Sequence, residues 1–102
     1  MTQVSFGKQS GFLTAFTLSG HSMAAEYGSD IVCAAISSAV YMAANTITEI
    51  LGVQADISVE DGYFRLSISE ADAERCAPMM EGLRLHLSEL ARQYPDHITM
   101  NT

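Results

Sequence analysis

Alternation of apolar and polar residues predicts the first strands of this chain. Val4–Phe6 and Gly11–Ser19 alternate with a period of two, so we expect two strands joined by Gly7-Lys8-Gln9-Ser10. Strict alternation in the second strand places Phe12, Phe16 and Leu18 on one face and Leu13, Ala15 and Thr17 on the other.

A second pair of alternating runs occupies the middle of the chain. Ala55–Glu60 and Tyr63–Ser69 flank Asp61-Gly62, which is a two-residue hairpin signal in which both positions would take positive φ. Ile98–Met100, after Pro95, is short enough for an edge strand.

Apolar residues at helical spacing predict a long helix between the two strand pairs. Asp30 is a suitable N-cap and Gly52 a suitable C′ residue. One apolar stripe consists of Ile36, Val40, Ala43, Ile47 and Ile50. Further alanines and Met42 spread apolar surface around the helix, as in a helix that is buried centrally or against a second subunit.

A second helix follows the middle strands. Ser69 and Asp72 resemble a capping box at its start. Its apolar stripe consists of Cys76, Met80, Leu83, Leu87, Leu90 and Tyr94. Pro78 lies inside this stripe, so we expect either a kink or a helix that starts near it.

These elements in the order ββαββαβ predict an α+β fold with two helices packed on an antiparallel or mixed sheet. A length of 102 residues, 48% hydrophobic and 17% charged, fits one globular domain over residues 1–102. No signal-peptide core and no run of membrane-spanning length is evident, so we expect a cytoplasmic protein with no membrane partner. The net charge of −7 argues against direct nucleic-acid binding and favours a basic protein or peptide partner.

The candidate chemistry is concentrated in Gly20–Ser38. His21 follows the second predicted strand, and Cys33 lies in the first turn of the helix predicted from Asp30. The first N–H groups of a helix lack intrahelical partners and carry the positive end of its dipole, so a thiolate is stabilised there. His21 could take the thiol proton or, as imidazolium, hold the anion. Cys33 is therefore a candidate nucleophile.

The loop between these two residues is the candidate substrate segment, and we expect it to close over a bound peptide. It consists of Ser22, Met23, Ala24, Ala25, Glu26, Tyr27, Gly28 and Ser29.

Each candidate also has a structural interpretation. Free cysteines are among the most buried residues, so Cys33 could be a small core residue, as we expect of Cys76. Asp30 could act only as a helix cap, and Ser37, one turn after Cys33, could serve only in packing although its hydroxyl could reach the site. The two cysteines and three histidines show no paired ligand spacing, so neither a metal nor a cofactor is predicted.

Gly20-His21 and Gly28-Ser29-Asp30-Ile31-Val32-Cys33-Ala34-Ala35-Ile36-Ser37 resemble the signature of the ribosomal-processing cysteine protease family, Prp. That signature is Gly-His-Ala, a short variable loop, and Gly-x-Asp-Ile-Val-Cys-Ala-Ala followed by an apolar residue and Ser. The resemblance extends to the Asp61-Gly62 hairpin and to Gln93-Tyr94-Pro95 before the last strand. Ser22 departs from the usual alanine, which bears on loop packing but leaves both catalytic positions intact.

The resemblance implies a homodimeric bacterial protease that removes an N-terminal extension from the twenty-seventh large-subunit ribosomal protein, cutting after an aromatic residue. It implies that Cys33 is the nucleophile and His21 the catalytic histidine, while Asp30 matches an aspartate of open role. Two alternatives remain at this point. One is a non-catalytic module that binds a ribosomal protein or an assembly intermediate, and the other is a thiol enzyme of another kind. A redox role is disfavoured because Cys33 has no resolving cysteine nearby in sequence.

Overall fold

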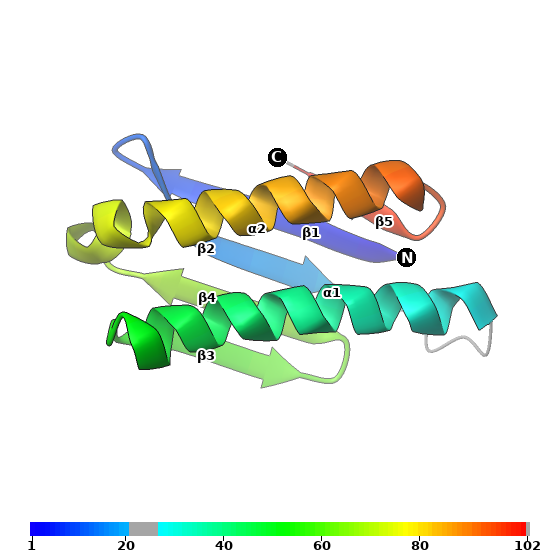
Figure 1. The fold of residues 1–102 in the computed structure, drawn as a ribbon, viewed down its shortest axis with the longest axis horizontal. Coiled ribbons are helices and arrows are strands. Elements are labelled where there is room, and N and C mark those ends of the chain that lie inside the picture. Colours follow the sequence, from blue (N-terminus) through cyan, green and yellow to red (C-terminus); the bar gives the residue numbers. More distant parts are fainter. Residues whose placement is uncertain (21–26, 102) are drawn as a thin grey trace.

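Two helices cover one face of a five-stranded mixed sheet (Figure 1). The computed structural model of the chain describes residues 1–20 and 27–101, and of residues 27–30 it describes the backbone. The strands are β1 (Thr2–Gln9), β2 (Phe12–Ser19), β3 (Ala55–Glu60), β4 (Tyr63–Ile68) and β5 (Ile98–Met100), in the sheet order β3-β4-β2-β1-β5. Among the strands of the described residues, only β5 pairs in parallel, with β1. The helices are α1 (Tyr27–Asn45) and α2 (Ala73–Gln93), so the predicted α+β fold and ββαββαβ order are confirmed.

The first hairpin turns later than predicted. β1 extends to Gln9, and the turn consists of Ser10 and Gly11, both with positive φ (54° and 87°). The expected connection of residues 7–10 is therefore wrong, since three of its four residues belong to the strand. A two-residue turn with positive φ at both positions matches the twist of the strands that it joins.

A bulge in β2 changes which residues face the core. Gly7 pairs with Ala15 but Lys8 pairs with Leu13, so Thr14 is an extra residue in β2. Because of this extra residue, Phe12 and Leu13, which precede it, face the sides of the sheet opposite to those that strict alternation predicts. Leu13 consequently joins Phe16 and Leu18 in the core, while Phe12 is 37% exposed, contrary to the prediction from strict alternation.

The second hairpin turns at Asp61 and Gly62, as predicted. Only Gly62 has a positive φ (75°), however, so the expectation of positive φ at both positions is wrong. The Gly62 carbonyl accepts a hydrogen bond of 2.9 Å from the Gly20 N–H, just beyond the end of β2. This bond joins the hairpin turn to the chain segment that leads into residue 21.

Helix α1 begins at Tyr27 rather than after Asp30. At its other end it continues into a π-helical turn, Thr46–Ile50, in which the Leu51 N–H donates to the Thr46 carbonyl at 2.8 Å. Gly52 (φ 67°) then ends the helical segment, as predicted. The earlier start makes Asp30 the fourth residue of the helix, so it is not the N-cap.

Helix α2 begins at Ala73, after a 3₁₀ turn over Glu70–Asp72, and Pro78 is its sixth residue. The alternative in which the helix starts near Pro78 is therefore wrong. The predicted capping box is also wrong, because the Ser69 hydroxyl donates to the Asp72 carboxylate (3.2 Å) and caps no backbone N–H. Five of the six predicted stripe residues are buried within the helix: Cys76, Met80, Leu83, Leu87 and Leu90.

The core lies between the helices and the sheet. Its α1 side is formed by Val32, Ile36, Val40, Ala43, Ala44 and Ile47. The prediction that no run has membrane-spanning length is wrong. Ile31–Ile50 has 20 residues and a mean hydropathy of 1.5, so this segment is long and apolar enough to span a membrane. In this fold its buried stripe packs into the core, and small residues such as alanine account for much of the remaining apolar character.

The bulge predicts different stabilities for two phenylalanine variants of one strand. Phe16 is fully buried, so Phe16→Ala should lower the free energy of unfolding by about 3–5 kcal/mol. Phe12→Ala, at the exposed position, should lower it by less than about 1 kcal/mol. Urea denaturation measures both, and Phe16→Leu serves if Phe16→Ala does not fold. Equal losses at the two positions would contradict the register.

Candidate active site

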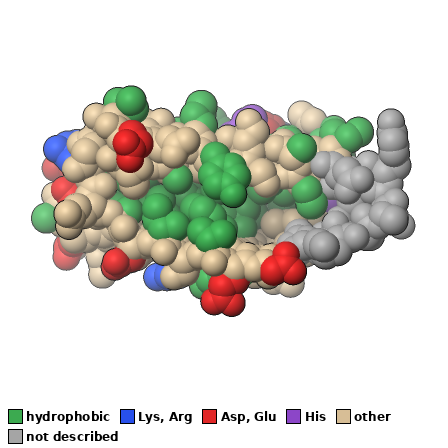
Figure 2. Space-filling view, turned by 90° about the horizontal axis from the view of Figure 1, so that it is seen from below, with side chains coloured by type: hydrophobic (Ala, Val, Ile, Leu, Met, Phe, Trp, Pro, Cys, Tyr) green, Lys and Arg blue, Asp and Glu red, His purple; other side chains and the backbone are tan. Residues whose placement is uncertain are grey.

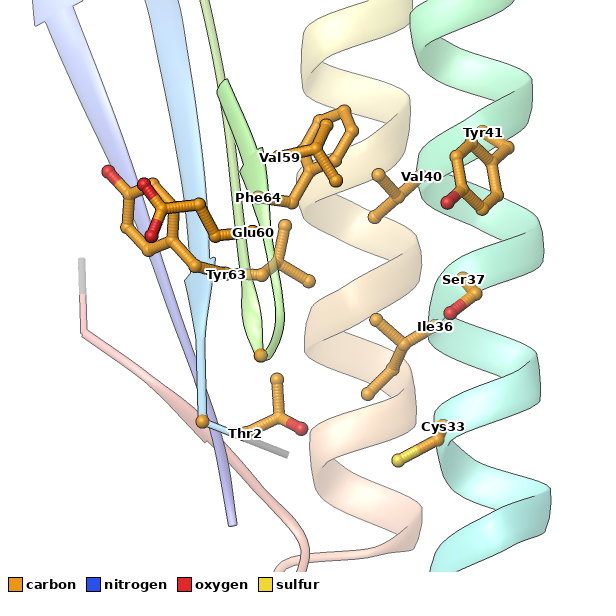
Figure 3. Close-up of a pocket in the computed structure, with 13 residues that line it drawn as sticks. Thr2, Cys33, Ile36, Ser37, Val40, Tyr41, Val59, Glu60, Tyr63 and Phe64 are labelled. Atoms are coloured by element: carbon orange, nitrogen blue, oxygen red, sulfur yellow. The ribbon is translucent and has the colours of Figure 1, made fainter. Parts of the chain in front are cut away.

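A groove runs between α1 and the β3–β4 hairpin, with a volume of about 300 Å³. Cys33 lies on its helix wall, and Gly20 and Gly62 lie where β2 ends and the hairpin turns. Figure 3 shows the Cys33 side chain directed from α1 toward the strands. The groove is lined by Thr2, Leu18, Gly20, Cys33, Ile36, Ser37, Val40, Tyr41, Val59, Glu60, Gly62, Tyr63 and Phe64.

The helix wall carries one polar and reactive stripe. Cys33, Ser37 and Tyr41 are spaced four residues apart, so they share a face of α1. Cys33 is half-buried, whereas Ser37 and Tyr41 are exposed. Ile36 and Val40 lie beside this stripe and are buried in the core, and this burial fixes the rotation of the helix. The stripe therefore faces the groove because the neighbouring stripe faces the sheet.

Aromatic packing supports the middle of the groove. The Phe64 ring stacks on Phe16 with centroids 5.9 Å apart, and Tyr41 meets Phe64 edge to face at 6.3 Å. Both are favourable aromatic geometries. With Val59 they form an apolar surface about two helical turns along α1 from Cys33. Glu60 is the charged residue among those that line the groove, and its side chain points away from α1 (Figure 3). The site therefore combines a thiol with apolar walls.

The end of β2 is held on two sides. Gly20 has φ 72°, and a Cβ atom at this position would lie 2.7 Å from the Met1 carbonyl oxygen. Its N–H is bonded to Gly62 in the hairpin turn. No side chain fits here, so the chain that leads into residue 21 starts from a fixed point beside the groove.

The structure describes some of the predicted site residues and not others. Cys33 and Ser37 line one groove. His21 lies outside the described residues, as do Ser22, Met23, Ala24, Ala25 and Glu26. Tyr27, Gly28 and Ser29 were expected in the substrate loop, but their backbone is helical.

The early start of α1 corrects the argument for Cys33. A helix that begins at Tyr27 leaves the N–H groups of residues 27–30 without intrahelical partners. Cys33 is its seventh residue, and the effect of the dipole is concentrated in the first turn. The expectation that Cys33 occupies the first turn is therefore wrong.

Sequence reasoning missed Tyr41, Val59, Glu60 and Phe64 as groove residues. For Tyr41 a signal was present, because it continues the four-residue spacing from Cys33 and Ser37. The other three come from the hairpin, and only the packing of the hairpin against α1 brings them to the site.

The second thiol lies in a different environment. Cys76 is fully buried in the core stripe of α2, as predicted, and does not line the groove. Burial raises the pKa of the Cys76 thiol, Asp72 raises it further, and Arg75 opposes the shift. Among the residues that the structure describes, no three His, Cys, Asp or Glu side chains are grouped so as to hold a metal ion.

The chain is similar to known proteases over nearly its whole length. Residues 1–99 match the model of a family described as cysteine protease Prp. The ribosomal processing cysteine protease Prp of Bacillus subtilis is 30% identical over 96 residues, which cover 88% of this chain and 86% of that protein. Two crystal structures share the fold over 99% of this chain. A Streptococcus mutans protein is 29% identical, with a TM-score of 0.84 and 92% of its own chain covered. S. aureus Prp with a covalently linked product peptide is 25% identical, with a TM-score of 0.86 and 98% of its own chain covered.

The difference in burial predicts selective alkylation. Iodoacetamide at pH 7–8 should label Cys33 first, because its thiol opens into the groove whereas Cys76 is buried and its raised pKa keeps it protonated. Labelling of Cys76 should increase with pH above the usual thiol range or on unfolding. Peptide mapping by mass spectrometry identifies the modified residue, and the variant Cys76→Ala is the matched control. Faster labelling of Cys76 in the folded protein would contradict this assignment.

Proposed function

The chain belongs to the Prp family of cysteine proteases, and from this we propose that it removes an N-terminal extension from the twenty-seventh large-subunit ribosomal protein during ribosome maturation. The observation that supports this most directly is Cys33, the cysteine of the family signature, which opens into a peptide-sized groove. The names of the relatives, which describe ribosomal processing, favour a ribosomal protein as the substrate.

In the proposed mechanism, the Cys33 thiolate attacks the carbonyl carbon of the scissile bond. His21 takes the thiol proton and gives it to the leaving amine, so that an acyl-enzyme remains. Water, activated by His21, then releases the new carboxylate. The product peptide that is covalently linked to S. aureus Prp supports a covalent route of this kind.

Asp30 and Ser37 are proposed as supporting residues. Ser37 lies one helical turn after Cys33 on the same groove wall, where its hydroxyl could hydrogen-bond a bound peptide. Asp30 is three residues before Cys33 and belongs to the same signature, which is the ground for including it.

The groove also favours the proposed substrate. An aromatic or apolar side chain would be accommodated by Val59, Tyr41 and Phe64. Glu60, which is exposed on the other face of the strand that carries Val59, and the net charge of −7 favour a basic segment, as expected of a protein that contacts ribosomal RNA. This partner would place the enzyme in the cytoplasm.

The central prediction separates the two cysteines. With a peptide that spans the extension junction of the host's ribosomal protein, Cys33→Ala and His21→Ala should each lower kcat/KM by at least about a thousandfold, since each removes a reacting group. Cys76→Ala should retain activity and cost about 1–2 kcal/mol of stability. Chromatography with mass spectrometry measures cleavage, and circular dichroism checks that each variant is folded. Cleavage by Cys33→Ala would rule out Cys33 as the nucleophile, and no cleavage by the folded wild-type protein would favour a non-catalytic binding module.

We further propose a homodimer in which α1 contributes to the interface. The sequence argument for a dimer rests on the apolar surface of Ala35, Ala39, Met42 and Ala43. In the structure, however, Ala43 is buried, and Ala35 and Ala39 pack against the protein's own core. Of that group only Met42 is well exposed, at 61%. The proposed contact is therefore centred on Met42.

Light scattering at micromolar concentration tests the dimer. The wild-type protein should have twice the chain mass, and Met42→Glu should shift it toward the monomer because a charge at an apolar contact is costly to desolvate. Leu85→Glu, at a similarly exposed apolar position on α2, is the matched control and should remain dimeric. A monomeric wild-type protein would contradict the proposal.

A further inference from the structure

The outer edge of β3 continues from the catalytic groove. β3 is the last strand of the sheet, so one of its edges has no partner strand within residues 1–20 and 27–101. Val59 belongs both to this edge and to the lining of the groove that contains Cys33. Figure 2 shows the molecule from this side, with hydrophobic side chains gathered in the middle of the face and acidic side chains along its rim.

The hydrogen-bond pattern shows which backbone groups this edge offers. Residues of an antiparallel strand bond alternately to one neighbour and to the other. The Gly20 N–H donates to the Gly62 carbonyl on the β2 side, so the next residue, Tyr63, bonds toward β3. Its partner Glu60 therefore bonds toward β4, as do Ser58 and Asp56. The N–H and C=O groups of Ala55, Ile57 and Val59 consequently point outward.

The two faces of this edge differ in chemistry. Ile57 and Val59 lie opposite Leu66 and Phe64 on the helix side of the sheet, yet they remain 43% and 60% exposed. Tyr41 of α1, 55% exposed, lies beside Val59 in the groove lining. The alternate residues Asp56 and Glu60 are exposed on the other side of the sheet. An extended edge with exposed apolar side chains and unpaired backbone groups is a ready template for another strand.

We propose that the substrate peptide binds as an added strand on β3. Its outward N–H and C=O groups would pair with those of Ala55, Ile57 and Val59. Alternate side chains of the peptide would then contact either the apolar surface of Ile57, Val59 and Tyr41 or the acidic surface of Asp56 and Glu60. The specificity is accordingly for an extended segment in which apolar and basic residues alternate. This inference rests on the proposed protease function and adds how the substrate is held.

Two observations favour a peptide over a second copy of this chain. The edge is continuous with the groove that contains the nucleophile candidate, so a strand on β3 leads toward Cys33. Two copies paired through β3 would instead bring Asp56 and Glu60 of both onto the same face, where like charges are destabilising. A basic peptide has the opposite charge and meets no such repulsion.

Proline at position 57 tests the backbone contact. The Ile57 N–H points outward, so Ile57→Pro removes a donor from the edge without removing a bond to β4. Ile57→Ala removes the side chain alone and is the matched control. With the junction peptide described above, Ile57→Pro should lower kcat/KM at least about fivefold further than Ile57→Ala, which corresponds to one lost hydrogen bond. Circular dichroism and light scattering establish the fold and the oligomeric state of each variant.

A second measurement uses the wild-type enzyme and varies the peptide instead. Peptides with one N-methylated amide each, scanned along the segment, should lose cleavage at every second position, because only alternate amides face β3. Uniform effects along the segment would overturn the added strand. Cleavage by wild type with equal rates for Ile57→Pro and Ile57→Ala would also overturn it and leave the proposed function standing. If Ile57→Pro converts a dimer to a monomer and leaves kcat/KM unchanged, the edge binds a second copy of the chain. That result would also overturn the inference.

Discussion

The hydrogen bond from the Gly20 N–H to the Gly62 carbonyl joins three parts of the site. It fixes the end of β2 to the β3–β4 turn, and the Met1 backbone lies so close to Gly20 that no Cβ would fit. The same bond continues the register of β4 against β2, and this register shows, through β4, which groups of β3 point outward. The positions of the end of β2, the β3–β4 turn beside the groove and the outer edge of β3 are therefore fixed relative to one another.

Burial of the core stripe of α1 also determines which residues of this helix face the groove. Val32, Ile36 and Val40 must be buried, and each residue of an α-helix is rotated by about 100° from the last. Cys33 follows Val32 directly, and Ser37 follows Ile36. Burial of one stripe thus places the thiol and the hydroxyl at the groove without any contact made specifically for them.

The order of elements could be predicted because each has its own apolar period, whereas several boundaries could not. Ser10-Gly11 is a dipeptide typical of turns, so this turn carries a signal in the sequence, whereas the Thr14 bulge has no signature in an alternating pattern. Asp30 resembles an N-cap, yet α1 extends to Tyr27, so the local preference did not decide the start. Of the groove, Cys33 was predictable from its motif, but Val59 and Phe64 reach it only through tertiary packing.

The position of Cys33 within α1 has a mechanistic consequence. In a helix that starts at Tyr27, the amide of its seventh residue pairs with the carbonyl four residues earlier. That amide cannot also stabilise an oxyanion while the helix keeps this form, whereas in a helix that starts after Asp30 it would have no intrahelical partner. Donors for the tetrahedral intermediate must then come from groups without intrahelical partners, such as the Ser37 hydroxyl on the same groove wall.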